Sequence, residues 1–246
     1  GKIIKLTVMK HSLSTRATTF LLTDPSPCPY LDGMFERRLV ADLKGFEETS
    51  MYELLSRSGF RRNHDVVYTP VCENCRACLA VRTVVNQFKP TASQRRVERL
   101  NKNLVAHPVE AIATYEQFEL FSKYQNGRHG NGDMARMDFV EFRALIEDNV
   151  IGTFVLEFRV ADELLGACVV DQMTDGLSAV YSFFDPSHGK KSLGTKIVLD
   201  LISLASQRSL PFVYLGYWVS GSPKMEYKDK FKPLEYYNGR RWEALN

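Results

Sequence analysis

The sequence has no long hydrophobic run and few cysteines, and both absences restrict what the protein can be. No apolar stretch among the 246 residues approaches the roughly 20 residues that a membrane-spanning helix needs. No hydrophobic segment of the signal-peptide kind follows the start, so we expect neither a membrane partner nor export. Only five cysteines are present, and one site can account for four of them. This disfavours a disulfide framework and favours a reducing, cytoplasmic location.

Familiar catalytic motifs are missing as well. The order G-x-x-x-x-G-K-[ST] of a phosphate-binding P-loop does not occur, and no Ser–His–Asp arrangement is visible. Internal repeats and low-complexity segments are absent. With 44% hydrophobic and 25% charged residues, the composition is that of a soluble globular protein of one large or two modest domains.

The cysteines that are present form a pattern. Cys72, Cys75 and Cys78 are each separated by two residues, so a short loop can bring three thiolates to one centre. Cys28, followed by proline, is the candidate fourth ligand. Four such ligands suit a tetrahedral zinc ion or a cubane iron–sulfur cluster. The spacing predicts a metal site without identifying the metal, and free or buried thiols remain the alternative.

Positive charge is concentrated in one segment. Residues 57–102 contain ten basic and three acidic residues, a net charge of +7, so the rest of the chain carries −4. This polarity predicts a polyanionic partner, with a solvated basic surface as the alternative. A helix over 94–104, capped by Ser93, would place part of this charge on one face. Four of its side chains are predicted to contact a nucleic-acid backbone: Arg95, Arg96, Arg99 and Lys102.

Periodicity predicts the elements of the amino-terminal part. Apolar residues at helical spacing predict a helix over 34–43, and a second short helix begins at Ser50 and ends at Gly59. Strands at 65–68 and 81–85 flank the cysteine loop and are expected to pair as a small metal-stabilised ribbon. We place the domain boundary at His107-Pro108, which gives an α+β cysteine domain over 1–106 and a second domain over 107–246.

The carboxy-terminal part reads as a mixed α/β sheet. Two amphipathic helices, 114–124 and 135–148, are joined by a glycine-rich loop over 127–133. Strands follow at 153–160, 164–171 and 177–184, and another lies at 211–217. On simple alternation Tyr214 and Gly216 share one side of the last strand, and Tyr217 lies on the other. A final hairpin is predicted on the Asn238-Gly239 turn.

The loop 187–194 separates the third of these strands from a helix that carries Leu193, Ile197, Leu201 and Leu204 on one face. Backbone amides at a helix start favour an anion, and glycine lets an anion approach closely. This strand–loop–helix arrangement resembles the acyl-donor loop of the GNAT acyltransferase fold. A tight surface turn is the alternative.

Several motifs follow one another along roughly residues 28 to 242. They are Cys28-Pro29-Tyr30-Leu31, Glu36-Arg37, Gly59-Phe60-Arg61-Arg62, the cysteine run, Ser93-Gln94-Arg95-Arg96, Tyr181-Ser182-Phe183-Phe184-Asp185-Pro186, Ser192-Leu193-Gly194, Tyr214-Leu215-Gly216-Tyr217-Trp218 and Lys224-Met225-Glu226-Tyr227-Lys228. Together these motifs resemble the aminoacyl-tRNA–protein transferase family, and most closely its bacterial aspartate/glutamate leucyltransferase branch. One departure is Ala80, where the family pattern leads us to expect proline.

This resemblance implies a GNAT-like carboxy-terminal half and an amino-terminal cysteine domain. The implied activity moves an amino acid, leucine in the favoured interpretation, from its tRNA to the α-amine of a protein that begins with Asp or Glu. The partners would be an aminoacyl-tRNA and these proteins, with no DNA, and the product would enter the N-degron degradation pathway. In eukaryotic relatives the cysteine region is associated with an iron–sulfur cluster.

The chemistry requires little beyond alignment, because an aminoacyl ester is already activated and an α-amine with a pKa near 7.7–8.0 is partly neutral. An acidic acceptor side chain favours arginine, and Arg82 is the first candidate and Arg62 the second, each with a structural ion pair as the alternative. The aminoacyl end of the donor is assigned to Tyr181 and Asp185, as candidate catalytic residues, with Ser192, Leu193 and Gly194. Aromatic residues including Tyr214 and Tyr217 could line an acyl pocket, and Lys224 and Lys228 could contact the tRNA acceptor stem.

Three other interpretations stay open at this point. Arginine could be the donated amino acid, in which case the donor pocket should contain a buried carboxylate. A coenzyme A-dependent acetyltransferase could use the same loop, although the cysteine domain and the basic segment argue against it. A non-catalytic, metal-dependent RNA-binding module would bind tRNA without turnover.

Overall fold

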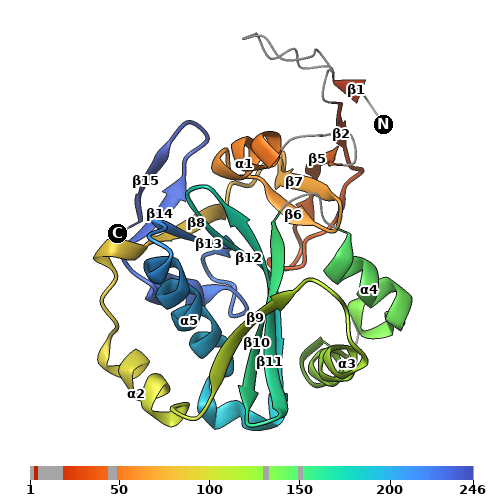
Figure 1. Ribbon diagram of the computed structural model, residues 1–246. Coiled ribbons are helices and arrows are strands. Elements are labelled where there is room, and N and C mark those ends of the chain that lie inside the picture. Colours follow the sequence, from red (N-terminus) through yellow and green to blue (C-terminus); the bar gives the residue numbers. More distant parts are fainter. Residues whose placement is uncertain (1–2, 5–18, 44–48, 130–132, 149–151, 246) are drawn as a thin grey trace.

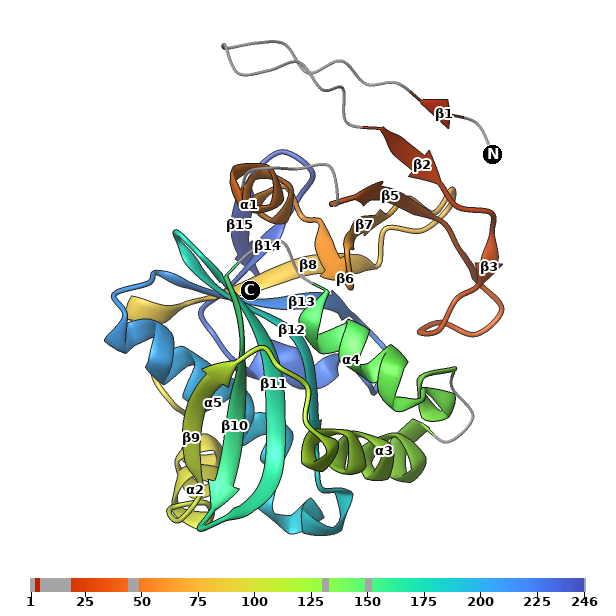
Figure 2. The ribbon, with the colours of Figure 1, turned by 45° about the vertical axis from the view of Figure 1, so that its right-hand side comes forward.

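The structure is a computed structural model that describes residues 3–4, 19–43, 49–129, 133–148 and 152–245. Residues 130–132 of the predicted glycine-rich loop lie outside this part. Within it, two sheets of different size stand against each other, with the smaller one at the top of the views in Figures 1 and 2. No helix in the described ranges is long and apolar enough to cross a membrane.

The larger sheet has eight strands in the order β15-β14-β8-β13-β12-β11-β10-β9 within the described residues. All neighbouring pairs are antiparallel except β12 and β13, which are parallel because helix α5 carries the chain back between them. The strands are β8 (Cys78–Val84), β9 (Val105–Glu110), β10 (Thr153–Val160), β11 (Glu163–Met173), β12 (Gly176–Phe184), β13 (Phe212–Val219), β14 (Leu234–Tyr237) and β15 (Trp242–Leu245).

Helices cover both faces of this sheet (Figure 1). On one face, Leu193, Ile197 and Leu201 of α5 are buried in a core that also contains Val81 and Leu156 from the strands. On the other face, α3 and α4 bury a second core around aromatic side chains. The helices are α2 (Ala92–Leu100), α3 (Tyr115–His129), α4 (Phe139–Glu147) and α5 (Leu193–Gln207), with short 3-10 helices at η1 (Val85–Gln87), η2 (Asp133–Arg136), η3 (Pro186–Lys191) and η4 (Glu226–Lys230).

The smaller sheet packs against central strands of the larger one, β11 to β13. Its core includes Phe20, Ala41 and Val67 together with Met173 and Tyr214, which belong to the large sheet. Its order is β1-β2-β5-β7-β6, and β3 and β4 form a separate pair. The elements are β1 (Ile3–Ile4), β2 (Phe20–Leu22), β3 (Ser26–Pro27), β4 (Phe35–Glu36), β5 (Arg38–Asp42), α1 (Thr49–Arg57), β6 (Arg61–Asn63) and β7 (Val66–Pro70).

Two predictions for this part are wrong. The segment 34–43 is not a helix, because Val40 pairs with Tyr68 and Ala41 with Val67 in the small sheet. Strand pairing with a buried neighbour outweighs a helical spacing that extends over only ten residues. The ribbon is also absent, because β7 lies in the small sheet and β8 in the large one. The cysteine loop therefore connects the two sheets.

Most other predicted elements are confirmed. The strands at 153–160, 164–171, 177–184 and 211–217, the final hairpin and the helices that became α1, α3, α4 and α5 are present with small shifts of their ends. Helix α2 begins earlier than predicted, because Thr91 rather than Ser93 is its N-cap and forms a capping box with Gln94. The predicted boundary after residue 106 falls within β9, and β8 from the amino-terminal part joins the large sheet.

Candidate active site

The two parallel strands at the centre of the large sheet separate soon after they pair. Pairing is confined to Gly176–Ser178 of β12 and Phe212–Tyr214 of β13, although β12 continues to Phe184 and β13 to Val219. Beyond Tyr214, β13 pairs with no strand on its β12 side within the described residues. Lys228, from η4, donates instead to the carbonyl of Tyr217 at 2.7 Å. The two strands thus diverge between two predicted site residues, Tyr181 on β12 and Tyr217 on β13.

A β-bulge at Leu215 determines which tyrosines face the small sheet. Tyr214 lies opposite Arg82 of β8, whereas Gly216 lies opposite Val81 and Tyr217 opposite Ala80. Arg82 and Ala80 are two residues apart, so Tyr214 and Tyr217 share one face. The alternation predicted from the sequence is wrong here, because the extra residue reverses it. Both tyrosines lie at the contact between the two sheets.

The predicted donor residues gather at the other end of β12. Ser192, with a positive φ of 51°, precedes α5, and Leu193 behind it is buried. A Cβ atom on Gly194 would lie 3.2 Å from the ring of Phe184, so this position requires a small residue. The start of α5 is therefore packed closely against the end of β12. Anion binding at this helix start stays a prediction, which rests on the amides that a helix start leaves unpaired.

Asp185 holds this loop in place. Its carboxylate accepts from the amide of Ser187 at 2.8 Å and from Lys123 Nζ at 2.7 Å. Burial alone would raise the pKa of Asp185, but the hydrogen bonds from Lys123 and Ser187 outweigh it and lower the pKa to about 2. A carboxylate with so low a pKa is a weak general base, so the contacts favour a positioning role for Asp185. Sequence reasoning missed Lys123, because its partner lies 62 residues away.

Tyr181 lies on β12 at the divergence, and its hydroxyl accepts a hydrogen bond from the buried amide of Gln125 in α3. Burial raises the pKa of Tyr181 above its ordinary value of 10.0, so the phenol stays protonated and can donate a hydrogen bond. This is compatible with a role in stabilising an oxyanion.

The two arginines predicted to bind the acceptor carboxylate already hold carboxylates of this chain. Arg62 Nε and Nη2 donate to the two oxygens of Asp171 at 2.8 and 2.9 Å, and both side chains are almost completely buried. Arg82 Nε donates to Glu235 at 2.7 Å, and its guanidinium carbon lies 3.4 Å from the ring centre of Phe212. These contacts favour the structural alternative for both residues.

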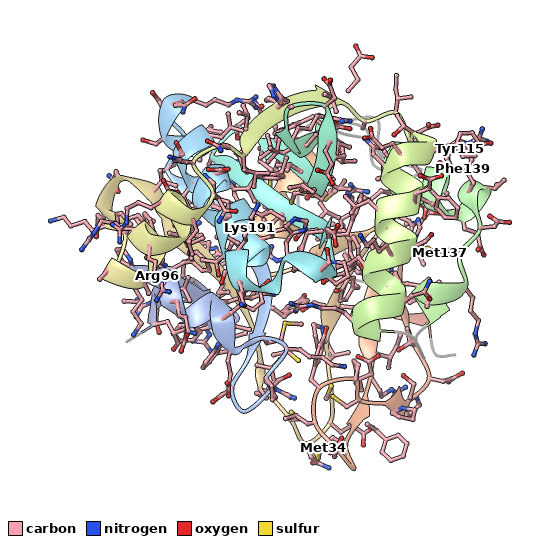
Figure 3. All side chains as sticks on the ribbon, turned by 90° about the horizontal axis from the view of Figure 1, so that it is seen from below. Met34, Arg96, Tyr115, Met137, Phe139 and Lys191 are labelled. Carbon is pink, nitrogen blue, oxygen red and sulfur yellow. The ribbon has the colours of Figure 1, made fainter. Side chains whose placement is uncertain are left out.

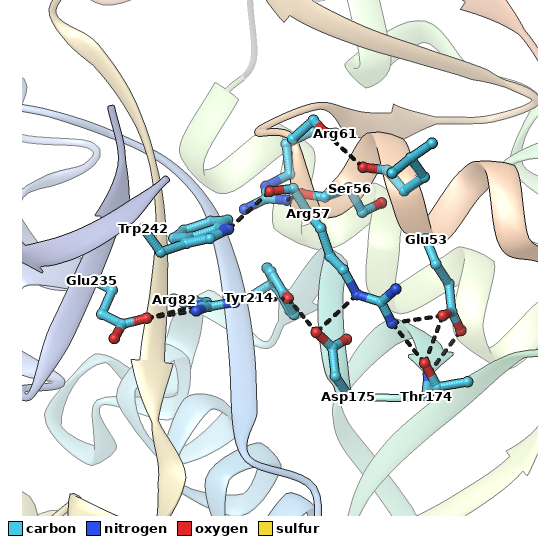
Figure 4. A network of polar contacts seen from close by, with 12 residues as sticks. Glu53, Ser56, Arg57, Arg61, Arg82, Thr174, Asp175, Tyr214, Glu235 and Trp242 are labelled. Atoms are coloured by element: carbon cyan, nitrogen blue, oxygen red, sulfur yellow. Dashed lines mark hydrogen bonds and ion pairs between the residues drawn. The ribbon is translucent and has the colours of Figure 1, made fainter. Parts of the chain in front are cut away.

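Arg82 belongs to a polar network at the contact of the two sheets (Figure 4). Its Nη1 donates to the hydroxyl of Tyr214 at 3.1 Å, and that hydroxyl donates to Asp175 at 2.9 Å. Asp175 in turn accepts from Arg57 Nε, which connects the large sheet to α1. Tyr214 is fully buried in this network. Tyr214 therefore does not line an acyl pocket in this structure, contrary to the prediction.

One arginine at this contact lacks such a partner. Arg61, next to Arg62 in β6, is 5% exposed, and its Nε and Nη2 have no hydrogen-bond partner among the described residues. Lys228 is also buried, so it offers no charged surface to a tRNA stem, which argues against its predicted role. Burial and the nearby Arg61 charge lower the pKa of Lys228 to about 7. Because successive side chains of a strand point to opposite faces of the sheet, the sequence Arg61-Arg62 could have indicated that the two arginines have different surroundings.

The four predicted metal ligands line one small pocket together with Tyr30, Tyr68 and Tyr217. Burial, and then the charges of the three other cysteines, raise the pKa of Cys78 to about 12. Mutual repulsion of thiolates is relieved by a bound cation, so the donor set suits a thiophilic metal in number and chemistry. In the described ranges, however, no three Cys, His, Asp or Glu side chains have the arrangement of a metal site. The thiols surround the pocket without forming a coordination sphere.

The basic residues of α2, and Lys102 just after its end, lie on a different part of the surface. The helix stops at Leu100 rather than at residue 104 as predicted. Arg95, Arg96, Arg99 and Lys102 are exposed, and Lys224 is exposed as well. Figure 3 shows Arg96 on one flank of the molecule and Met34, which lines the cysteine pocket, at another edge. An exposed basic helix is open to a polyanion, and the cysteine pocket is separate from it.

Two family models match the chain. One, described as arginine-tRNA-protein transferase, N terminus, matches residues 26–96, and the corresponding C-terminus model matches residues 116–238. A solved structure, of L-PGS from Bacillus licheniformis, is similar with a TM-score of 0.50 and 12% identity, over 78% of this chain and 65% of that one. This likeness concerns the fold alone.

Relatives that share far more of the sequence are named aspartate/glutamate leucyltransferase. The protein from Paramagnetospirillum magneticum is 48% identical over 96% of this chain and 98% of its own length. That from Rhodospirillum rubrum is 48% identical over 92% of this chain and 93% of its own. Matches of this extent, together with the two family models, show that the chain belongs to the arginine-tRNA-protein transferase family, a family of aminoacyltransferases.

Proposed function

We propose that this protein transfers leucine from Leu-tRNA to the α-amine of proteins that begin with Asp or Glu. The observation that carries the proposal is the identity of 48% over nearly the whole chain to relatives named aspartate/glutamate leucyltransferase. The product would carry an amino-terminal leucine and enter the N-degron pathway. Cytoplasmic Leu-tRNA and acidic acceptor proteins are then the partners.

The geometry supports a division of the site into two ends. Ser192, Leu193 and Gly194 at the start of α5 form the donor end, where helix amides can hold the terminal phosphate and ribose of the tRNA. Tyr181 lies on β12 between this end and the contact of the sheets, and its protonated hydroxyl can donate to the tetrahedral oxyanion. The acceptor amine attacks the ester carbonyl, and its partial neutrality near pH 8 supplies the nucleophile without a dedicated base. The tetrahedral intermediate then breaks the ester C–O bond, and the ribose oxygen of the tRNA leaves as a hydroxyl with the proton that the amine gives up.

The finer fold assignment is also a proposal. A parallel pair of strands that separates after three paired residues, followed by a loop and a helix start, supports a GNAT-like arrangement of the carboxy-terminal half. The division into domains at 1–106 and 107–246 is retained as a prediction, and it falls between the segments matched by the two family models.

Cys28, Cys72, Cys75 and Cys78 are the residues that would hold a zinc ion or an iron–sulfur cluster. A metal there would fix the loop that connects the two sheets, because Cys72 follows β7 and Cys78 begins β8. Its contribution would be to the position of Tyr217, which lines the same pocket.

The test is transfer of labelled amino acid from Leu-tRNA and from Arg-tRNA to a peptide that begins with Asp, with protein purified anaerobically. Transfer from Leu-tRNA alone supports the proposal. Transfer from Arg-tRNA alone would keep the family and change the donor, an outcome that the family description makes the second candidate. Binding of tRNA without transfer from either would favour the RNA-binding module.

The predicted tRNA contacts of α2 can be tested with charge reversal of Arg95 and Arg99. Each phosphate contact that is lost should reduce the slope of log affinity against log salt by about one. The binding of Leu-tRNA, measured by fluorescence anisotropy at several salt concentrations, should weaken while transfer at saturating tRNA persists. Unchanged affinity and slope would place the tRNA elsewhere.

A further inference from the structure

Arg61 has an unused hydrogen-bonding edge in a buried position. Its Nη1 donates to the carbonyl of Phe60 at 2.9 Å, and its guanidinium carbon lies 5.4 Å from the ring centre of Tyr214. The remaining donors, Nε and Nη2, are buried and meet no acceptor among the described residues. A buried donor without an acceptor lowers the stability of the fold, so two such donors on one side chain require an explanation.

The neighbouring arginines show what this edge binds. Arg62 uses Nε and Nη2 to hold the two oxygens of Asp171, and Arg82 directs the same two nitrogens at Glu235. The spacing of these nitrogens matches that of carboxylate oxygens, which makes the pair bidentate and specific. Arg61 presents the same edge with no carboxylate on it.

Lys228 brings a second cation to this place. The hydroxyl of Tyr217 donates to the carbonyl of Gly59, two residues before Arg61, and the carbonyl of Tyr217 accepts from Lys228 Nζ. Tyr217 thus connects the start of β6 to the ammonium group. No acidic side chain forms an ion pair with Arg61 or Lys228 in the part of the chain that the structure describes. Burial and the nearby Arg61 charge disfavour the charged form of Lys228, and an anion bound between the two basic groups would favour that form again.

We propose that Arg61 and Lys228 bind the side-chain carboxylate of the acceptor's first residue, Asp or Glu. This inference rests on the proposed function and assigns its acceptor specificity to residues other than Arg62 and Arg82. A carboxylate on Arg61 would complete the pattern of its two neighbours and offset one positive charge of the pair. The acceptor's α-amine would then lie near the divergence of β12 and β13, toward Tyr181.

A free chain end suits this position better than a tRNA phosphate. Arg61 is only 5% exposed, and each phosphate within a polynucleotide carries bulky nucleosides on both sides. The first residue of an acceptor carries its carboxylate on a stem of one or two methylene groups and can enter end-on. The exposed arginines of α2 are accessible to the tRNA backbone without such a restriction.

The test uses the full-length protein, Leu-tRNA and two peptides that differ only in an amino-terminal Asp or Asn. Arg61→Met and Lys228→Met are compared with Arg143→Met, which removes an exposed arginine of α4. Arg61→Met should raise the KM for the Asp peptide by roughly 30-fold or more and remove the preference for Asp over Asn. Arg61→Lys, which keeps the charge without the fork, should be intermediate. The affinity for Leu-tRNA and the Arg143→Met kinetics should not change.

Three outcomes would overturn the inference. If Arg61→Met keeps the preference for the Asp peptide over the Asn peptide, the acceptor carboxylate does not bind to Arg61. Loss of Leu-tRNA affinity with the preference intact would assign the edge to a phosphate. Equal loss of kcat for both peptides at unchanged KM would make Arg61 structural. Wild-type protein that transfers to neither peptide would instead refute the proposed function, and circular dichroism of each variant confirms that it is folded.

Discussion

Arg61 and Arg62 are adjacent in β6 and equally buried, yet they differ in what they bind. Arg62 is held by Asp171, which also accepts from Tyr52 and Thr153, so this pair joins the small sheet to the large one. Arg61 stacks on Tyr214, and its Nε and Nη2 have no hydrogen-bond partner among the described residues. We use this difference to separate two roles of a buried arginine: Arg62, with a carboxylate partner in the chain, serves the fold, and Arg61, without one among the described residues, is proposed to serve a ligand.

The largest effect on stability should come from Arg62→Met. Removing one member of a buried pair leaves Asp171 charged without its partner, and we expect the free energy of unfolding to fall by about 3–5 kcal/mol. Urea denaturation measures it. The double variant Arg62→Met/Asp171→Asn should recover part of the loss, because the amide carries no charge and still accepts from Tyr52. A loss below about 1 kcal/mol for the single variant would contradict a structural role.

Arg61→Met should change the free energy of unfolding by less than about 1 kcal/mol, or increase it. The substitution removes an unpaired buried cation and keeps an apolar stem over Tyr214. The same denaturation measurement applies, with Arg62→Met as the matched comparison. Destabilisation as large as that of Arg62→Met would remove the distinction between the two residues.

Lys228 should make stability depend on pH above neutrality. In the folded protein burial lowers its pKa to about 7, whereas the unfolded amine titrates at about 10.5. Between these values unfolding takes up a proton, so the free energy of unfolding should rise with pH across this window. In Lys228→Met this rise should be smaller. Parallel curves of stability against pH for the variant and the parent would show that folding does not lower the pKa of Lys228.

Asp185, whose charge is satisfied within the chain, should give the smallest effect and the opposite pH range. Because its pKa is lowered from 3.8 to about 2, it stabilises the fold above about pH 4 and loses this contribution as the pH falls to about 2. Asp185→Asn should cost less than about 1 kcal/mol at neutral pH, since Lys123 is half exposed. The difference between variant and parent should disappear below pH 2 in acid titrations of stability.

The sequence predicted the elements whose signals are local. Runs of strand-forming residues predicted β10 to β12, and the apolar stripe of α5 and the Asn238-Gly239 turn were sufficient for their elements. The segment 34–43 failed, because its pairing with β7 depends on residues more than 20 positions away. The separation of β7 and β8 into different sheets was invisible for the same reason.

The sequence identified residues that gather at the site more successfully than it identified what each of them does. The four cysteines do line one pocket, and the donor loop does precede a helix start. Arg62 and Arg82 were chosen for their chemistry, but their partners Asp171 and Glu235 lie over 100 residues away and could not be seen. The bulge at Leu215 places Tyr214 and Tyr217 on the same face of β13, and the alternation of residues along the sequence does not reveal such a bulge.

The most direct test of the difference between Arg61 and Arg62 is a double-mutant cycle across the acceptor complex. It combines Arg61→Met in the protein with Asp→Asn at the first residue of the peptide, and reads kcat/KM for leucyl transfer. The account predicts a coupling free energy of about 2–5 kcal/mol, because each change removes the same contact. Additive effects, with coupling below about 0.5 kcal/mol, would show that the unpaired Nε and Nη2 of Arg61 do not bind the acceptor.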